Sequence, residues 1–157
     1  MKKHGIAIIL AAVCVLGQAG VLAQTESEKA AIEQEALKVM SAIEQAAQNL
    51  DASHFLDFVL EKGTTALNGK LFLDREEAHR AIERSYQAIS KQEMTVQHHV
   101  TVLSPTAVLV VSDGAARATL ADGREVGPIP FAQTVVLVLK DGQWKVLHAH
   151  SSSDRPR

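Results

Sequence analysis

The sequence predicts an α+β domain in which helices come first and a sheet of antiparallel strands comes last. Apolar residues recur at spacings of three and four over residues 32–50, as on the buried face of a helix. Asn68-Gly69 separates two short β-prone runs, which indicates a hairpin. After Lys91, three turns divide the chain into four long β-prone runs. Helices followed by a run of strands are typical of the α+β class.

The first 23 residues have the layout of a secretory signal peptide. Lys2 and Lys3 precede an apolar stretch over residues 6–16, and Val21-Leu22-Ala23 ends it with a small residue suited to cleavage. We therefore predict cleavage after Ala23 and export to the periplasm or the medium, with no membrane association afterwards. The alternative is an uncleaved anchor, because residues 5–23 are just long enough to span a thin bilayer.

The composition of the remaining chain excludes several classes of function. Residues 24–157 contain no cysteine, so neither a disulfide nor thiol chemistry is expected. Loss of Lys2 and Lys3 changes the net charge from −2 to −4, and an acidic chain of this kind does not suit nucleic acid. No nucleophile motif or glycine-rich phosphate loop is present, and we predict no cofactor.

Three helices are predicted in the first part of the chain. Thr25 with Glu28 forms a capping box that begins the first helix, and Asn49-Leu50-Asp51 ends it. Its apolar stripe consists of Ile32, Ala36, Met40, Ile43, Ala47 and Leu50, and Glu33, Glu35 and Glu44 are expected on its solvated face. The second helix is predicted from Ser53 to Gly63, and the third begins after Asp74 and ends near Ser90.

Four strands are predicted over residues 94–103, 106–120, 126–139 and 143–152. Short turns between long strands indicate an antiparallel meander. The two middle strands are apolar on both faces, whereas a sheet with one wet face would alternate. We therefore expect a homodimer in which the second face meets another copy of the sheet. The alternative is that the third helix and the chain end cover part of that face.

The last strand contains the most informative candidate residues. Trp144, Val146, His148 and His150 alternate with other residues, so a regular strand would place both imidazoles on the face of the tryptophan. We predict that Trp144, His148 and His150 line a pocket, and His148 and His150 are the best candidates for a general base. The alternative is ordinary packing against the first helix. A shared metal with His98 is not predicted, because three strand spacings separate them.

Four further residues complete the predicted pocket. His98 alternates with Met94, Val96, Val100 and Val102, so it should point inward. Tyr86 and His79 lie two turns apart on one side of the third helix. Arg117, between two alanines of a long strand, is a candidate for holding an anionic ligand at the mouth, or else an exposed strand residue.

The order of elements, together with the ending Asp-Gly-x-Trp-x-Val-x-His-x-His-x-Ser, resembles SnoaL-like domains of the nuclear transport factor 2-like superfamily. The chain is also similar to the association domain of calcium/calmodulin-dependent protein kinase II. That second similarity rests on these segments: Leu73-Asp74, His79-Arg80, Val102-Leu103-Ser104-Pro105, Ile129-Pro130 and Ala132-Gln133.

The resemblance implies a cone-shaped fold, with three N-terminal helices packed on a curved antiparallel sheet that encloses a cavity. It also implies that His79 matches a pocket residue of the association domain. Leu67 and Ile43 stand where the ketosteroid isomerases of this superfamily have a general base and a phenol donor, and Ser151 stands where the association domain has an arginine. Neither the ligands of the ketosteroid isomerases nor those of the association domain can therefore be assigned directly to this chain.

These observations lead to three functional hypotheses for a domain over residues 24–153, followed by a disordered tail at 154–157. The first is binding of a small, partly apolar molecule in the conical pocket. The second is an isomerase, cyclase or hydratase that uses a pocket histidine as general base. The third is a non-catalytic oligomerisation module.

Overall fold

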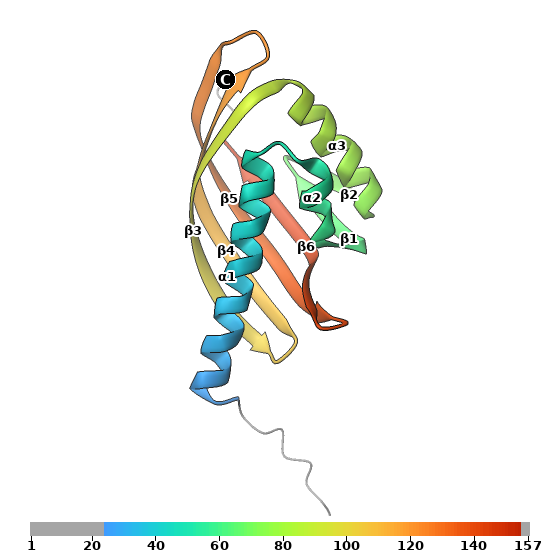
Figure 1. Cartoon of the computed structure of the whole chain (residues 1–157), viewed down its shortest axis with the longest axis vertical. Coiled ribbons are helices and arrows are strands. Elements are labelled where there is room, and N and C mark those ends of the chain that lie inside the picture. The colour runs from blue at the N-terminus through green and yellow to red at the C-terminus, as the bar shows by residue number, and fades with distance from the viewer. Residues whose placement is uncertain (1–23, 155–157) are drawn as a thin grey trace, which may run out of the picture.

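A computed structural model describes residues 24–154 of the chain as three helices packed on one six-stranded sheet (Figure 1). The predicted signal peptide and the last three residues of the predicted tail lie outside these described residues. Among the described helices, none has the length and apolar character needed to cross a membrane. The predicted α+β class is confirmed.

The helices are α1 (Glu26–Gln48), α2 (Ala52–Asp57) and α3 (Arg75–Gln87). The predicted capping box begins α1: Glu28 N donates to Thr25 Oγ1 at 3.2 Å, and Thr25 N donates to the Glu28 carboxylate at 2.8 Å. Asp74 caps α3 by accepting from Glu77 N at 2.8 Å. The prediction for α2 was too long, because the chain enters a strand directly after Phe58 and continues extended through Gly63.

The strands are β1 (Val59–Leu67), β2 (Lys70–Phe72), β3 (Ile89–Ser104), β4 (Ala107–Leu120), β5 (Glu125–Lys140) and β6 (Gln143–Ser153). Their order in the sheet is β2-β1-β6-β5-β4-β3, so the predicted meander is confirmed. Asn68 and Gly69 turn between β1 and β2 with positive φ angles of 49° and 81°, as in the hairpin turns that Asn-Gly favours. The sheet is not wholly antiparallel, because β1 pairs with β6 in parallel.

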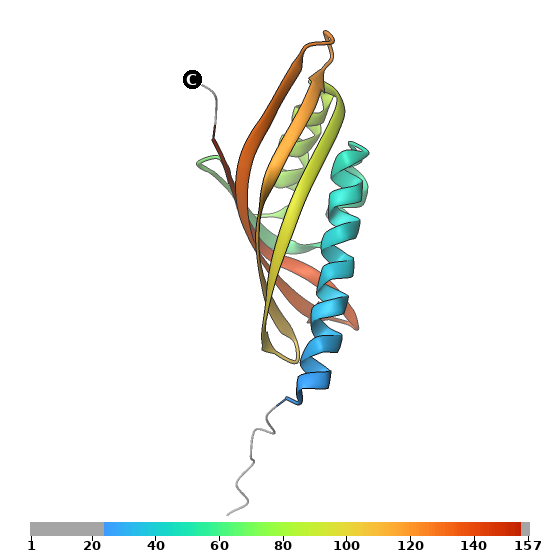
Figure 2. The ribbon, with the colours of Figure 1, turned by 90° about the vertical axis from the view of Figure 1, so that its left-hand side faces the viewer.

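The helices lie along one face of the curved sheet (Figures 1 and 2). We call this the concave face and the opposite one the outer face. The core forms where α1 crosses the concave face, and burial of its apolar side chains supplies the main driving force for folding. The fully buried members are Ala36, Met40, Val108, Val110 and Leu137.

A β-bulge in β6 reverses the predicted orientation of two histidines. Val146 pairs with Leu137, but the next pair is His148 with Val136, so Leu147 has no partner on β5. An extra residue shifts every later side chain to the opposite face. Trp144, Val146 and Ala149 consequently pack with the core, whereas His148 and His150 lie on the outer face. The expectation that both imidazoles share the face of Trp144 is therefore wrong.

Candidate acid–base site on the concave face

A row of polar side chains crosses the concave face from β3 to β6. His98 pairs with Ser112, Ser112 with Gln133, and Gln133 with Ser151. The row two residues away along the strands is wholly apolar and consists of Val100, Val110, Val135 and Ala149. Gln133 and Ser151 are half-buried, whereas Val110 and Val135 are buried. The polar row therefore borders the packed core, and Ser112 within it is itself buried.

His98 is held at both ring nitrogens. Its Nδ1 lies 2.7 Å from Ser112 Oγ, and its Nε2 lies 2.7 Å from Glu44 Oε1 of α1. The side chains of His98 and Glu44 are only 12% and 23% exposed, and Ser112 is 1% exposed. A carboxylate and an imidazole at this separation, both shielded from bulk water, are in direct polar contact.

Glu44 turns one carboxylate oxygen into the protein and leaves the rest of its side chain accessible. Oε1 is fully buried and, apart from the His98 ring, has no polar partner among residues 24–154. The exposed part of the side chain therefore belongs to its other atoms. Glu44 was expected on the solvated face of α1, and that expectation is wrong. A residue four positions after the buried Met40 lies on almost the same side of a helix.

Ser112 can keep its contact with the His98 ring in either direction of hydrogen bonding. A hydroxyl both donates and accepts, so Ser112 donates to a neutral His98 ring and accepts from a doubly protonated one. Because Ser112 is buried, it cannot itself reach a substrate, and its role is to orient the ring. This is the arrangement of a proton-transfer group whose geometry is set by a neighbouring side chain.

Tyr86 of α3 supplies a phenol that stays protonated. Burial, helped by the negative charge of Asp51, raises the pKa of Tyr86 to about 12. Asp51 is fixed in place because it caps α2 by accepting from His54 N at 2.9 Å. Tyr86 is therefore a hydrogen-bond donor, not an anion, across the physiological pH range.

The other predicted site residues do not gather around His98. His148 Nδ1 lies 2.7 Å from Thr64 Oγ1 on the outer face, and His150 is exposed. Arg117 is exposed and pairs with Glu93, on the face opposite to Met94 and Ala116, so its predicted place at the mouth of the cone is wrong. Trp144 packs against the core, and His79 is half-buried on α3.

His98 is the predicted candidate that the structure places in a polar cluster, and its inward orientation is confirmed. Within residues 24–154, no group of three histidine, cysteine, aspartate or glutamate side chains is arranged to hold a metal ion. The chemistry that the cluster itself offers is proton transfer.

Three helices on one curved sheet are the fold of a solved protein of the nuclear transport factor 2-like family, to which the chain is similar in structure. The family model for the SnoaL-like domain matches residues 36–156, and the chain belongs to that family. The predicted resemblance is thus confirmed. None of the curated proteins compared with the chain has a significantly similar sequence.

Solved structures support the same fold at low sequence identity. A putative scytalone dehydratase from Novosphingobium aromaticivorans has a TM-score of 0.74 and 12% identity, over 83% of this chain and 89% of that chain. A putative dehydratase of the same superfamily from Streptomyces avermitilis has a TM-score of 0.72 and 16% identity, over 82% and 99%. The hexachlorocyclohexane dehydrochlorinase LinA-type3 from Novosphingobium barchaimii has a TM-score of 0.72 and 11% identity, over 83% and 92%.

Proposed function

We propose that this chain is an acid–base enzyme that removes a proton from a small, partly apolar molecule bound against the concave face. The observation that carries the proposal is the shielded contact of Glu44 with His98, whose other ring nitrogen meets Ser112. The names of three structural neighbours, two putative dehydratases and a dehydrochlorinase, denote elimination reactions, which also begin with or include loss of a proton. They support the proposal by analogy of fold alone.

In the proposed step, the carboxylate oxygen of Glu44 that does not contact His98 accepts a proton from a carbon beside an electron-withdrawing group. The electrons of the broken C–H bond pass into the adjacent electron-withdrawing group, as in formation of an enolate from a ketone. The His98 ring, whose Nε2 lies 2.7 Å from Oε1, fixes the orientation of the carboxylate.

A second candidate function is binding without chemistry. It is favoured by one specific observation: both nitrogens of His98 already have partners, so the ring has no free lone pair for a substrate. In that case the polar row would recognise a ligand and the Glu44–His98 pair would be structural. The two candidates differ in whether a bound molecule exchanges its acidic hydrogens.

The test is deuterium exchange into β-tetralone, a small ketone with acidic hydrogens, followed by proton NMR in heavy water. The wild-type protein is expected to speed exchange above the buffer rate, and Glu44→Gln to reduce that acceleration roughly 100-fold, the usual contribution of a general base. The matched control is Glu35→Gln, since Glu35 lies on the same helix but is exposed and pairs with Lys38. Control exchange should equal that of the wild type.

Two results would decide against the enzyme. Acceleration in Glu44→Gln as large as in the wild-type protein would contradict the role of Glu44. Binding of β-tetralone with no acceleration by the wild-type protein would favour the second candidate. The role of His98 is tested in the same exchange experiment with His98→Asn. His99→Asn is its control, because His99 is exposed on the opposite face of the sheet.

We also infer that the chain is exported and acts as a homodimer. The proposal of export rests on the leader-like residues 1–23. A mature protein whose mass corresponds to a chain that starts at Gln24 would support it.

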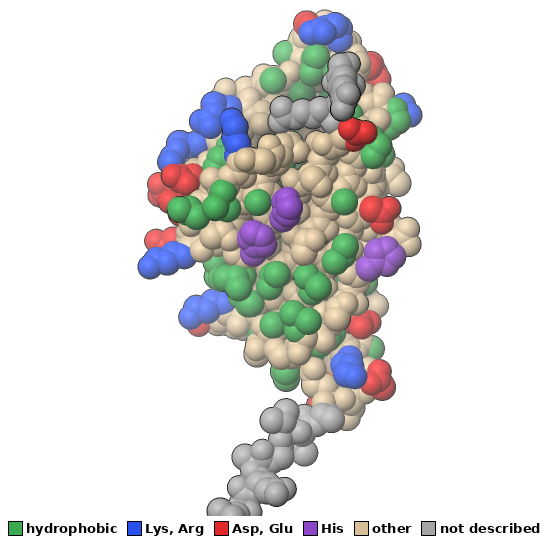
Figure 3. Space-filling view, turned by 180° about the vertical axis from the view of Figure 1, so that it is seen from behind, with side chains coloured by type: hydrophobic (Ala, Val, Ile, Leu, Met, Phe, Trp, Pro, Cys, Tyr) green, Lys and Arg blue, Asp and Glu red, His purple; other side chains and the backbone are tan. Residues whose placement is uncertain are grey.

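The proposal of a dimer rests on the outer face, where apolar and histidine side chains gather over the middle and charged side chains lie mainly around the rim (Figure 3). Val111 is 43% exposed there, and Leu103 is 58% exposed. An apolar centre with a charged rim is the usual anatomy of a protein interface.

A further inference from the structure

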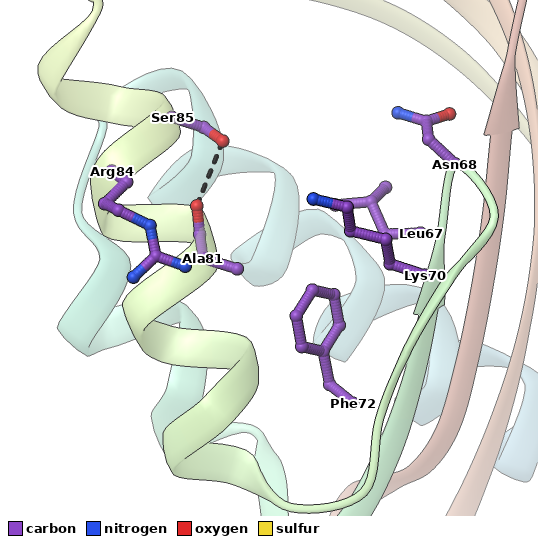
Figure 4. A pocket seen from close by; sticks show the side chains of 7 residues that line it. All are labelled: Leu67, Asn68, Lys70, Phe72, Ala81, Arg84 and Ser85. Atoms are coloured by element: carbon purple, nitrogen blue, oxygen red, sulfur yellow. Dashed lines mark hydrogen bonds between the residues drawn. The ribbon is translucent and has the colours of Figure 1, made fainter.

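We propose that a cavity between the β1–β2 hairpin and α3 binds a small organic anion with an apolar body, such as an aromatic carboxylate. The cavity has a volume of about 310 Å³ (Figure 4). This size is at the lower end of the range of ligand pockets, so it suits a molecule of one ring and not a long chain. Its lining comes from two separate elements, the hairpin and the last turns of α3.

Two positive side chains and no negative one line the cavity. Lys70 extends from the start of β2, and Arg84 extends from α3 on the other side (Figure 4). Among residues 24–154, no carboxylate forms an ion pair with either of them, whereas the neighbouring Arg80 of α3 pairs with Glu76 at 3.7 Å. An anion entering the cavity would therefore meet two cations without displacing an existing partner. A guanidinium in addition favours the planar, two-oxygen geometry of a carboxylate.

The remaining lining residues favour a ligand that has an apolar body and a group that accepts hydrogen bonds. The ring of Phe72 faces into the cavity, with Leu67 and Ala81 beside it (Figure 4). The side-chain oxygen of Asn68 already accepts from Ser153 N at 3.2 Å and from Ser153 Oγ at 3.1 Å. Its amide NH₂ group therefore remains as the part that can contact a ligand, and it donates only. A donor beside two cations selects an anion over a neutral or cationic molecule.

This inference does not depend on the chemistry proposed for Glu44 and His98. The cavity lies at the β2 edge of the sheet, and Leu67 pairs with Ser151, the end of the polar row that is farthest from His98. Loss of proton transfer at Glu44 would leave anion binding intact. Loss of anion binding in the cavity would likewise leave proton transfer at Glu44 intact. The two proposals therefore succeed or fail separately.

The test is a titration of the ¹⁵N-labelled protein with benzoate, monitored by amide chemical shifts, beside the same titration with benzyl alcohol. Benzoate is expected to bind at roughly millimolar concentration and to shift amides around Asn68, Lys70 and Arg84. Benzyl alcohol should bind at least about fivefold more weakly, because it offers the ring without the charge. Added salt should weaken benzoate binding.

Variants separate the cavity from general surface charge. Arg84→Gln and Lys70→Gln are each expected to weaken benzoate binding about fivefold. Arg80→Gln, which removes a cation from the same helix outside the cavity, should leave it unchanged. Equal binding of benzoate and benzyl alcohol, equal binding by Arg84→Gln and the wild-type protein, or shifts centred on His98 instead of the hairpin would each overturn the proposal.

Discussion

At the scale of single residues, the site depends on a carboxylate that the fold places where solvent is scarce. Burial of a charged group is costly unless a partner compensates it, and His98 is the partner of Glu44. A pair of this kind adds little to stability compared with an apolar packing of the same volume. His98 therefore prevents the inward-facing oxygen of Glu44 from being buried without a partner.

Tyr86 provides a pH prediction with a clear sign. Burial and Asp51 raise its pKa from the ordinary value of 10.0 to about 12, so the folded state keeps the phenol proton at pH values where the unfolded state has lost it. The unfolded state then binds fewer protons, and the stability of the fold should fall as the pH rises from about 10 to 12.

Because the chain has one tyrosine, absorbance at 295 nm follows Tyr86 directly. A folded-state midpoint near 12 and a midpoint near 10 in concentrated urea are expected. A folded-state midpoint near 10, with the fold intact by circular dichroism, would show that Tyr86 is neither desolvated nor close to Asp51.

The two members of the pair differ in how far the sequence predicted them. His98 follows from simple alternation with Met94, Val96 and Val100, and β3 is regular at that point. Glu44 was missed because a charged residue beside a narrow apolar stripe was assigned to the solvated face. Its position four residues after Met40 and three before Ala47 was the available signal, since such residues are neighbours on a helix.

At the scale of elements, the helix caps and the Asn-Gly turn were predicted correctly, whereas the end of the second helix was not. Caps and the Asn-Gly turn act over a few residues, so they positioned α1, α3 and the hairpin. The bulge at Leu147 has no such local signal, because no glycine or proline stands there. One unpaired residue was enough to move His148 and His150 to the outer face. The parallel pairing of β1 with β6 joins segments about 80 residues apart, which periodicity does not predict.

Gly114 gives a prediction at the scale of the β3–β4 ladder. A Cβ at this position would overlap the Thr95 carbonyl oxygen of the neighbouring strand, and backbone cannot move aside as a flexible side chain can. Gly114→Ala is therefore expected to reduce the free energy of unfolding by about 3 kcal/mol or more.

Gly123→Ala is the matched control, measured by urea denaturation. Gly123 has a positive φ of 87° but open space around its Cβ position, so only backbone strain of about 1 kcal/mol is expected. Equal losses for the two variants would mean that β4 does not approach Thr95 as closely as the structure has it.

At the scale of the whole molecule, the two faces of the sheet have different tasks. The concave face holds the core and the Glu44–His98 pair, and the outer face carries a broad surface with few charges at its centre (Figure 3). The sequence predicted two apolar faces from the middle strands. It placed the histidines of β6 on the wrong face, because their orientation depends on the bulge.

If the outer face forms a homodimer, a charge at its centre should separate the subunits. Val111→Glu is expected to convert a dimer into a folded monomer in sedimentation-velocity experiments, because an unpaired buried charge is costly in an interface. Leu71→Glu is the control, since Leu71 is 61% exposed on the hairpin and not on the outer face of the meander. A wild-type protein that sediments as a monomer, or a Val111→Glu variant that stays dimeric, would contradict this assignment.

A crystal structure of the protein with β-tetralone bound would locate the acidic carbon of the ketone relative to Glu44. The ketone is expected to lie on the concave face beside the polar row, with its acidic carbon within about 3.5 Å of the Glu44 carboxylate, as a productive complex requires. A ketone bound beside His148 and His150 on the outer face, with Glu44 and His98 buried beneath packed side chains, would contradict it.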